Sequence, residues 1–157
     1  MNGVRTMMIA LAVALASGAA SAPALAQVEV KSAWVRATVA AQKTGGAYME
    51  ITSAKDATLI GAQTPVAGAA EVHETRMENN VMRMRAVPRL ALPAGKTVQF
   101  KPGGYHLMLV DLKRPLKKGE TVPLRLTIEN KDKSLATVEV NAEVRDLRAT
   151  APMDMHK

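Results

Sequence analysis

Short apolar and β-branched runs, separated by turn residues, recur along this chain from Val28 onward. Alternation within such runs is typical of strands, and no stretch keeps an apolar period near 3.6 residues for the length of an ordinary helix. Strands are expected at Val28 to Arg36, Gly46 to Thr52, Thr58 to Gln63, Ala70 to Thr75, Val81 to Ala86, Thr97 to Lys101, Tyr105 to Asp111, Thr121 to Glu129 and Leu135 to Val144. This spacing predicts one all-β domain, a sandwich or small barrel with Greek-key connections.

The first 26 residues have the features of a secretory signal peptide. Arg5 supplies a positive charge, Met7 to Ala16 is apolar, and Ala24-Leu25-Ala26 offers a small-x-small cleavage site. A retained membrane anchor is the less favoured alternative, because it would need about 20 uninterrupted apolar residues. We expect residues 1–26 to be removed, residues 27–148 to form the domain and residues 149–157 to form a flexible tail. The protein would then be periplasmic, without stable membrane insertion.

The formal net charge is +7, and Arg5 of the expected signal peptide contributes one unit of it. This balance favours an acidic partner or a membrane surface. Nucleic acid is not expected, because the few aromatic residues form no stacking array. The basic cluster at residues 113–118 is either a solvated surface or a means of steering an acidic partner. The chain has no cysteine, which excludes a lipid-modified N-terminal cysteine.

Two histidines and two methionines have a spacing that suggests a metal site: His73, Met84, His106 and Met108. Thioether sulfur is a soft donor and imidazole a borderline one, so this set suits Cu(I) better than Zn²⁺, Mg²⁺ or Ca²⁺. Residues two apart on a strand share a face, so His106 and Met108 should project together while Tyr105 points away into packing.

A two-residue turn at Asn79-Asn80 would bring the other two candidate ligands together, because Asn tolerates the positive φ angles of such a turn. Pairing outward from the turn sets Met77 against Met82 and Thr75 against Met84. His73 is then a diagonal neighbour of Met84 on the same face. This register predicts that the site draws on two strands of a hairpin and on the strand that carries His106.

Five further residues are candidates for accessory metal binding. Met77 and Met82 share the predicted face of the hairpin, although ordinary packing, or a supporting role beside the ligands, is the favoured interpretation of both. Met153, Met155 and His156 lie in the expected tail, where they either form a second, weaker site or occur by chance.

The chain resembles the PCu(A)C family of periplasmic copper chaperones over about residues 28–144. Its most specific stretches are Val81-Met82-Arg83-Met84-Arg85 and the segment from Pro102-Gly103-Gly104 through Met108-Leu109. The resemblance implies a cupredoxin-like Greek-key β-sandwich that holds Cu(I) near its surface. It also implies delivery of copper to the copper-bearing subunit of cytochrome c oxidase, alongside a Sco-type thiol protein. The family motif maps onto His73, Met84, His106 and Met108.

Three other classes of protein are alternatives to a copper carrier. A blue-copper electron carrier needs a cysteine thiolate, which this chain lacks. An enzyme finds little support, since no nucleophile elbow, paired carboxylates or phosphate-binding loop is present. A structural or adhesive periplasmic sandwich, whose methionines only fill the core, remains the alternative hypothesis.

Overall fold

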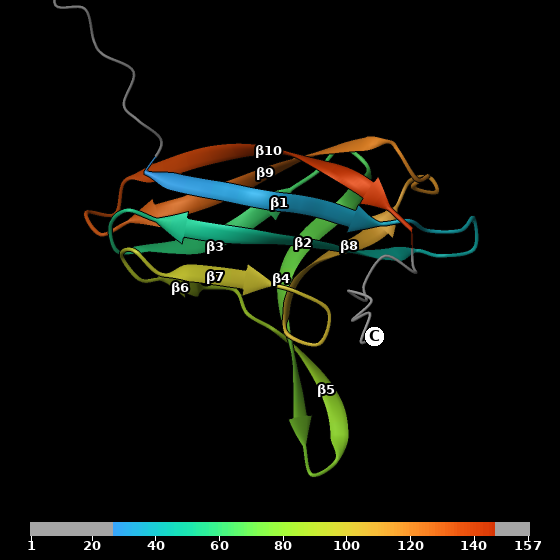
Figure 1. Ribbon diagram of the computed structural model, residues 1–157, viewed down its shortest axis with the longest axis horizontal. Coiled ribbons are helices and arrows are strands. Elements are labelled where there is room, and N and C mark those ends of the chain that lie inside the picture. The colour runs from blue at the N-terminus through green and yellow to red at the C-terminus, as the bar shows by residue number, and fades with distance from the viewer. Residues whose placement is uncertain (1–26, 147–157) are drawn as a thin grey trace, which may run out of the picture.

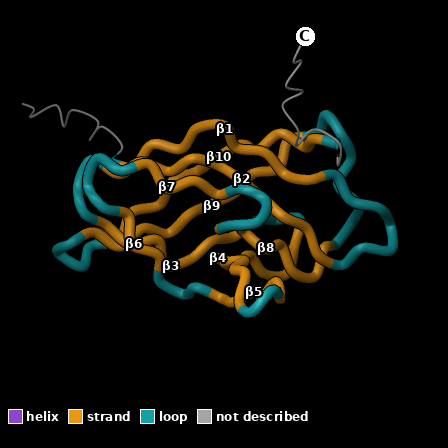
Figure 2. Tube along the Cα trace, turned by 60° about the horizontal axis from the view of Figure 1, so that its bottom comes forward, coloured by secondary structure: helices purple, strands orange, loops and turns teal. Residues whose placement is uncertain are grey.

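The computed structural model describes residues 27–146, and within them every regular element is a strand (Figures 1 and 2). The all-β prediction for a single domain is therefore confirmed. The strands are β1 (Val28–Arg36), β2 (Thr44–Ser53), β3 (Ala57–Gln63), β4 (Ala67–Glu78), β5 (Val81–Ala86), β6 (Leu90–Leu92), β7 (Thr97–Phe100), β8 (Tyr105–Leu112), β9 (Thr121–Asn130) and β10 (Leu135–Arg145).

The strands pair in the order β5-β4-β8-β7-β2-β1-β10-β9-β3-β6, with β2 also pairing β8. The pair Ala62 and Ala70 joins β3 to β4 and closes the sheet on itself. The β1–β10 and β7–β8 pairs are parallel, and the others are antiparallel. The result is a flattened barrel with two facing layers, whose ladders leave few open edges.

Alternating side chains of the long strands fill the space between the layers. Leu107 and Leu109 of β8 are fully buried, as are Ile51 of β2 and Leu126 and Ile128 of β9. Burying a side chain of this size stabilises the fold by about 1.5–3 kcal/mol. Because Leu107 and Leu109 point inward, the residues between and beside them in β8 point to the outer face.

One hairpin projects from the barrel, which we call the body of the protein. The first part of β4 pairs with β8 as far as Glu74, whereas beyond that residue β4 pairs only with β5. We call residues 75–86 the arm, and Figure 1 shows it projecting from the barrel. Asn79 and Asn80 form its turn with φ angles of 51° and 61°. The predicted register is confirmed, with Met77 opposite Met82 and Thr75 opposite Met84.

Several strands differ from the sequence prediction, mostly by one residue at an end; the larger differences are one missed strand and the two ends of β4, which runs on to Glu78 rather than Thr75. β6 was missed because it has only three residues, enclosed by Pro88 and Pro93, yet it pairs with β3. β4 begins at Ala67 rather than Ala70, in a segment of small residues with weak strand propensity that pairs with β8. β2 begins at Thr44 rather than Gly46, because Thr44 pairs with β8.

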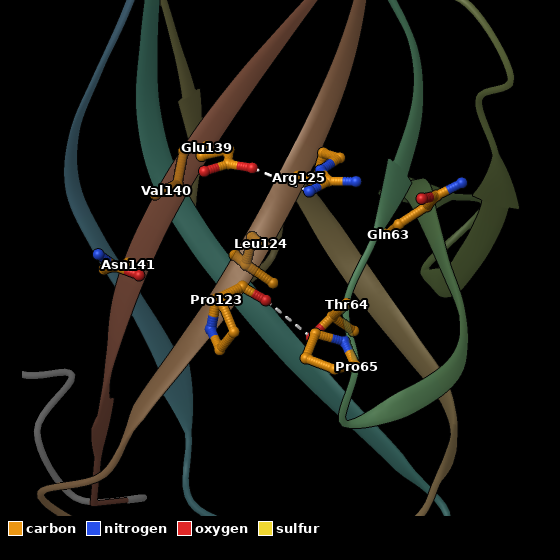
Figure 3. A pocket seen from close by; sticks show the side chains of 9 residues that line it. All are labelled: Gln63, Thr64, Pro65, Pro123, Leu124, Arg125, Glu139, Val140 and Asn141. Atoms are coloured by element: carbon orange, nitrogen blue, oxygen red, sulfur yellow. Dashed lines mark hydrogen bonds and ion pairs between the residues drawn. The ribbon is translucent and has the colours of Figure 1, made fainter.

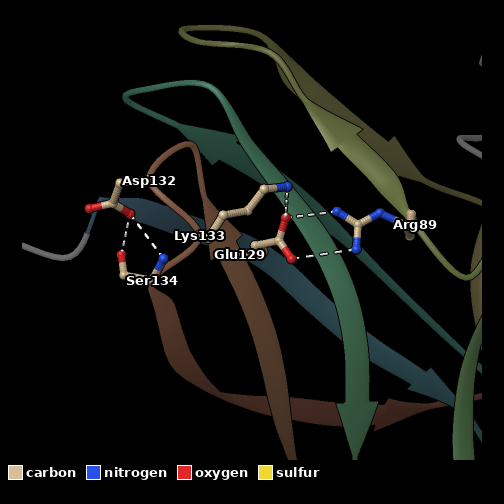
Figure 4. Close-up of polar contacts among 5 residues, drawn as sticks. All are labelled: Arg89, Glu129, Asp132, Lys133 and Ser134. Atoms are coloured by element: carbon tan, nitrogen blue, oxygen red, sulfur yellow. Dashed lines mark hydrogen bonds and ion pairs between the residues drawn. The ribbon is translucent and has the colours of Figure 1, made fainter.

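A network of charges ties the β9–β10 loop to the chain before β6 (Figure 4). Arg89 Nη2 lies 2.7 Å from Glu129 Oε1, and Lys133 Nζ lies 3.0 Å from the same oxygen. These hydrogen bonds, that of Arg89 first, lower the pKa of Glu129 to about 2. The carboxylate therefore stays ionised in the folded protein well below the pH at which it would otherwise take up a proton.

The basic cluster at residues 113–118 is not a uniform charged surface. Leu116 at its centre is fully buried, and Arg114 Nη1 lies 2.6 Å from Glu120 Oε2. The cluster follows the last residue of β8, Leu112, and so lies at the opposite end of that strand from His106.

Candidate metal centre

Two histidines face each other across β4 and β8. His73 is the direct partner of His106 in the antiparallel register, and their ring centroids are 5.8 Å apart with the planes inclined at 55°. His106 is buried, with 7% of its surface exposed, and the side chain of His73 is 17% exposed. Sequence spacing had not predicted this direct pairing, since it joins residues 33 apart in a strand pair with no short turn.

Each imidazole is fixed by one hydrogen bond. His106 Nδ1 lies 3.2 Å from the carbonyl oxygen of Gly104, and because a carbonyl only accepts, the ring nitrogen donates. His73 Nε2 lies 3.0 Å from Glu71 Oε2, to which it donates for the same reason. The Gly104 oxygen also accepts the backbone N–H of Thr75 at 3.0 Å, so the β7–β8 turn is bonded to the base of the arm.

The second nitrogen of each ring, Nδ1 of His73 and Nε2 of His106, is buried and has no hydrogen-bond partner among the described residues. Leaving a buried polar atom unsatisfied costs about 1–3 kcal/mol. Metal-binding histidines characteristically donate one ring N–H to a carboxylate or carbonyl and turn the other nitrogen to the metal. Both histidines therefore have the hydrogen bonding of ligands prepared for a metal ion.

Two methionines lie on the same face as the histidines. Met108 follows His106 by two residues and stands opposite Glu71, and Met84 stands opposite Thr75, diagonal to His73. Met84 is 53% exposed, in contrast to His106. The structure thus brings the four predicted residues to one face at the junction of β4, β5 and β8, with the imidazoles inside and a thioether toward solvent.

The local electrostatics favour a neutral imidazole at His106. Burial lowers its pKa below the ordinary value; the hydrogen bond that Nδ1 donates to the Gly104 carbonyl acts in the opposite direction, and the neighbouring His73 adds to the lowering. A neutral ring leaves Nε2 with a lone pair, which is what coordination requires.

Glu71 is the functional candidate that the sequence reasoning missed. Strand alternation could have identified it, because Glu71 and His73 are two residues apart in one strand and so share a face. Tyr105 points away from the histidines, as predicted, and its ring lies 6.0 Å from that of Phe100. Met153, Met155 and His156 fall outside the described residues.

Residues 27–146 offer no competing metal site of the ordinary kind. No group of three or more His, Cys, Asp or Glu side chains in this range is placed to hold a metal, so the histidine pair needs thioethers to complete a ligand set. An open hollow of about 490 Å³ lies instead beside β9 and β10, and the ion-paired Arg125 and Glu139 are among its lining residues (Figure 3). None of its lining residues belongs to β4, β5 or β8.

None of the described segments is a helix with the length and apolarity to span a membrane.

The family model described as "Putative lipoprotein LpqE-like" matches residues 28–144, nearly the whole described fold. The protein is a member of the LpqE-like family. A putative lipoprotein of Leifsonia xyli is 31% identical over 144 residues, which cover 86% of this chain and 87% of that one. An uncharacterized protein of Rickettsia prowazekii is 29% identical over 75% of this chain and 68% of its own length.

Solved structures show that this LpqE-like protein has the fold of PCuAC domains, as the sequence resemblance implied. The solution structure of the Cu(I) form of DR1885 from Deinococcus radiodurans is 33% identical, with a TM-score of 0.57, and the match covers 82% of this chain and 83% of that one. The apo PmoF2 PCuAC domain, at 22% identity, has a TM-score of 0.63 over 80% of this chain and 95% of its own. These likenesses confirm the predicted cupredoxin-like Greek-key sandwich.

Proposed function

We propose that this protein binds one Cu(I) ion through His73, Met84, His106 and Met108 and carries it to an acceptor. The observation that supports this most directly is the pair of buried imidazole nitrogens that have no hydrogen-bond partner in the described fold. A purely structural or adhesive sandwich would gain nothing from leaving them unpaired. Support also comes from the Cu(I) form of DR1885, which shares the fold and a third of its sequence.

The donor chemistry suits a carrier better than a permanent metal site. Two neutral imidazoles and two thioethers leave the bound Cu(I) with its positive charge, so nothing in the ligand set neutralises the ion as thiolates would. An acceptor with thiolate ligands can therefore take the ion by ligand substitution. Met84, exposed on the arm, is the first ligand that such an acceptor can replace.

The proposal includes a place and a destination. The exported character of putative lipoproteins in this family and the signal-like first 26 residues favour the periplasm, after cleavage before Gln27. The acceptor is the copper-bearing subunit of cytochrome c oxidase, together with a Sco-type thiol protein, as the PCu(A)C resemblance implies. Binding and transfer, not catalysis, is the proposed role.

A Cu(I) titration against a chromophoric chelator tests the metal site. We expect one tightly bound ion per chain, with a dissociation constant below about 1 μM. Met84→Leu and Met108→Leu keep the apolar volume and remove the sulfur, so each should weaken binding while the fold stays intact. Met49→Leu, in the core, is the matched control and should leave the affinity unchanged. Absence of binding in the parent protein would refute the proposal.

A further inference from the structure

The outer part of the arm exposes methionines that neither the core nor the proposed four-residue site uses. Met77 and Met82 are 63% and 57% exposed. With Val81 and Met84 they account for four of the six large, exposed hydrophobic side chains among residues 27–146. Core packing does not explain them, because β5 is exposed along its whole length. Strand propensity does not either, since β-branched residues would serve an exposed ribbon better.

The register places the two sulfurs to act together. Met77 and Met82 are directly opposed, next to the Asn79-Asn80 turn. The Cβ atoms of opposed residues are about 4.5–5.5 Å apart, and the flexible methionine side chain lets the two thioethers converge on one ion. Met84 is two residues from Met82 on the same face, in the direction of His73.

The charged groups of the arm lie on its other face. Arg76 and Arg83 oppose each other there, and their guanidinium groups pair with carboxylates of the same hairpin, Arg76 with Glu74 at 2.8 Å and Arg83 with Glu78 at 3.6 Å. Alternation directs these groups away from Met77 and Met82. The outer thioether face therefore offers soft donors without a carboxylate that would attract Mg²⁺ or Ca²⁺.

We propose that Met77 and Met82 form a second Cu(I) site, made only of thioethers, at the tip of the arm. With two ligands and no imidazole, it binds more weakly than the four-residue site at the arm's base. An incoming ion can bind at this exposed position first and then pass by way of Met84 to the histidines. The site itself stands independently of the proposed function, whereas its weaker affinity relative to the four-residue site and the destination of its ion rest on that function.

Methyl NMR with Ag(I), a soft monovalent ion that resists oxidation, resolves the two sites. The purified protein carries ¹³C in its methionine methyl groups, and Ag(I) is added in steps. We expect the first equivalent to shift the methyl signals of Met84 and Met108, and the second to shift those of Met77 and Met82. The signal of Met49, which is 1% exposed, should not move.

Two double variants test where the second ion binds. Met77→Leu with Met82→Leu should reduce binding from two equivalents to one while the shifts of Met84 and Met108 remain, which also shows that the variant folds. Met153→Leu with Met155→Leu is the matched control and should keep both steps. The proposal is overturned if Met77 and Met82 stay unshifted at two equivalents, or if the second ion shifts Met153 and Met155 instead. If only the four-residue site is wrong, Met84 and Met108 fail to respond as a pair with the first ion, and Met77 and Met82 still shift.

Discussion

The body and the arm are both built of alternating strands, but they differ in how much of each strand is buried. In the body, alternation hides one face of each strand, and side chains such as Leu107 and Leu109 are fully buried. In the arm, both faces of β5 are open, and the hairpin has one charged face and one thioether face. An isolated two-stranded hairpin is marginally stable in water, so the arm depends on the anchorage of β4 in the body.

The candidate centre lies where these two regions meet. β4 runs without interruption from the body into the arm, and His73 is close to the last residue that still pairs with β8. The body supplies the burial that lowers the pKa of His106, and the arm supplies an exposed sulfur at Met84. The body thus carries both imidazoles and the thioether of Met108, whereas the arm carries the exposed thioether of Met84.

The largest expected effect tests whether only the body stabilises the fold. Leu107→Ala should lower the free energy of unfolding by about 2–5 kcal/mol, because it leaves a cavity in the core. Met82→Ala, on the exposed arm, should change it by no more than about 0.5 kcal/mol. Urea unfolding of both variants measures the difference. Similar losses in the two variants would mean that the arm folds as part of the core.

A second prediction concerns the buried ligand at the junction. His106→Ala should weaken Cu(I) binding by more than about 100-fold, the upper range for losing a residue that only supports a ligand. Chelator competition measures the affinity. His156→Ala, outside the described residues, is the control and should leave the tight site unchanged. An unchanged affinity in His106→Ala would show that the metal ion binds elsewhere and not at the histidine pair.

Glu71 should have a smaller effect, because it holds His73 and does not itself complete the ligand set. Glu71→Ala removes the acceptor for His73 Nε2, and Cu(I) affinity should fall by about 10–100-fold. Glu71→Gln keeps an acceptor oxygen and should recover part of that loss. Glu139→Gln, in the ion pair with Arg125, serves as a control for the change in charge. If Glu71→Gln and Glu71→Ala weaken binding equally, the charge of Glu71 matters more than its positioning of the ring.

The smallest expected effect is on stability, and it concerns Glu129, which lies in the body outside the candidate metal centre. Because the pKa of Glu129 is lowered to about 2 in the folded state, its ion pairs add stability above its ordinary pKa of 4.5, and this contribution is lost as the pH falls toward 2. Glu129→Gln should therefore lose less stability than the parent protein between pH 5 and pH 3, as measured by urea unfolding. Arg89→Met should show the same trend. Parallel pH dependences in parent and variant would show that the network adds no stability.

Local signals in the sequence predicted the arm and the face of β8. The Asn79-Asn80 turn fixed the register, because a two-residue loop leaves only one way to pair the strands. Alternation alone placed His106 with Met108 and turned Tyr105 inward. Most strand positions followed from turn residues between apolar runs; the errors were the missed β6 and boundaries such as the start of β4.

The missing parts were nonlocal or hidden by weak propensity. The direct opposition of His73 and His106 depends on the β4–β8 pairing, which no turn specifies. Glu71 was not predicted because it orients a candidate ligand, His73, and is not itself one of the soft donors whose spacing marks the site. β6 is too short to be recognised and exists because β3 offers an edge to pair with.

The β4–β8 pairing also sets the order in which the site can be built. The arm's turn is local and can bring His73 near Met84 early in folding, and His106 and Met108 are neighbours along the chain at all times. The two halves meet only after β8 has found β4, a contact of long sequence separation that forms late in folding. A chain that is still unfolded would lack the complete set of proposed ligands, and copper loading would then report that folding is finished.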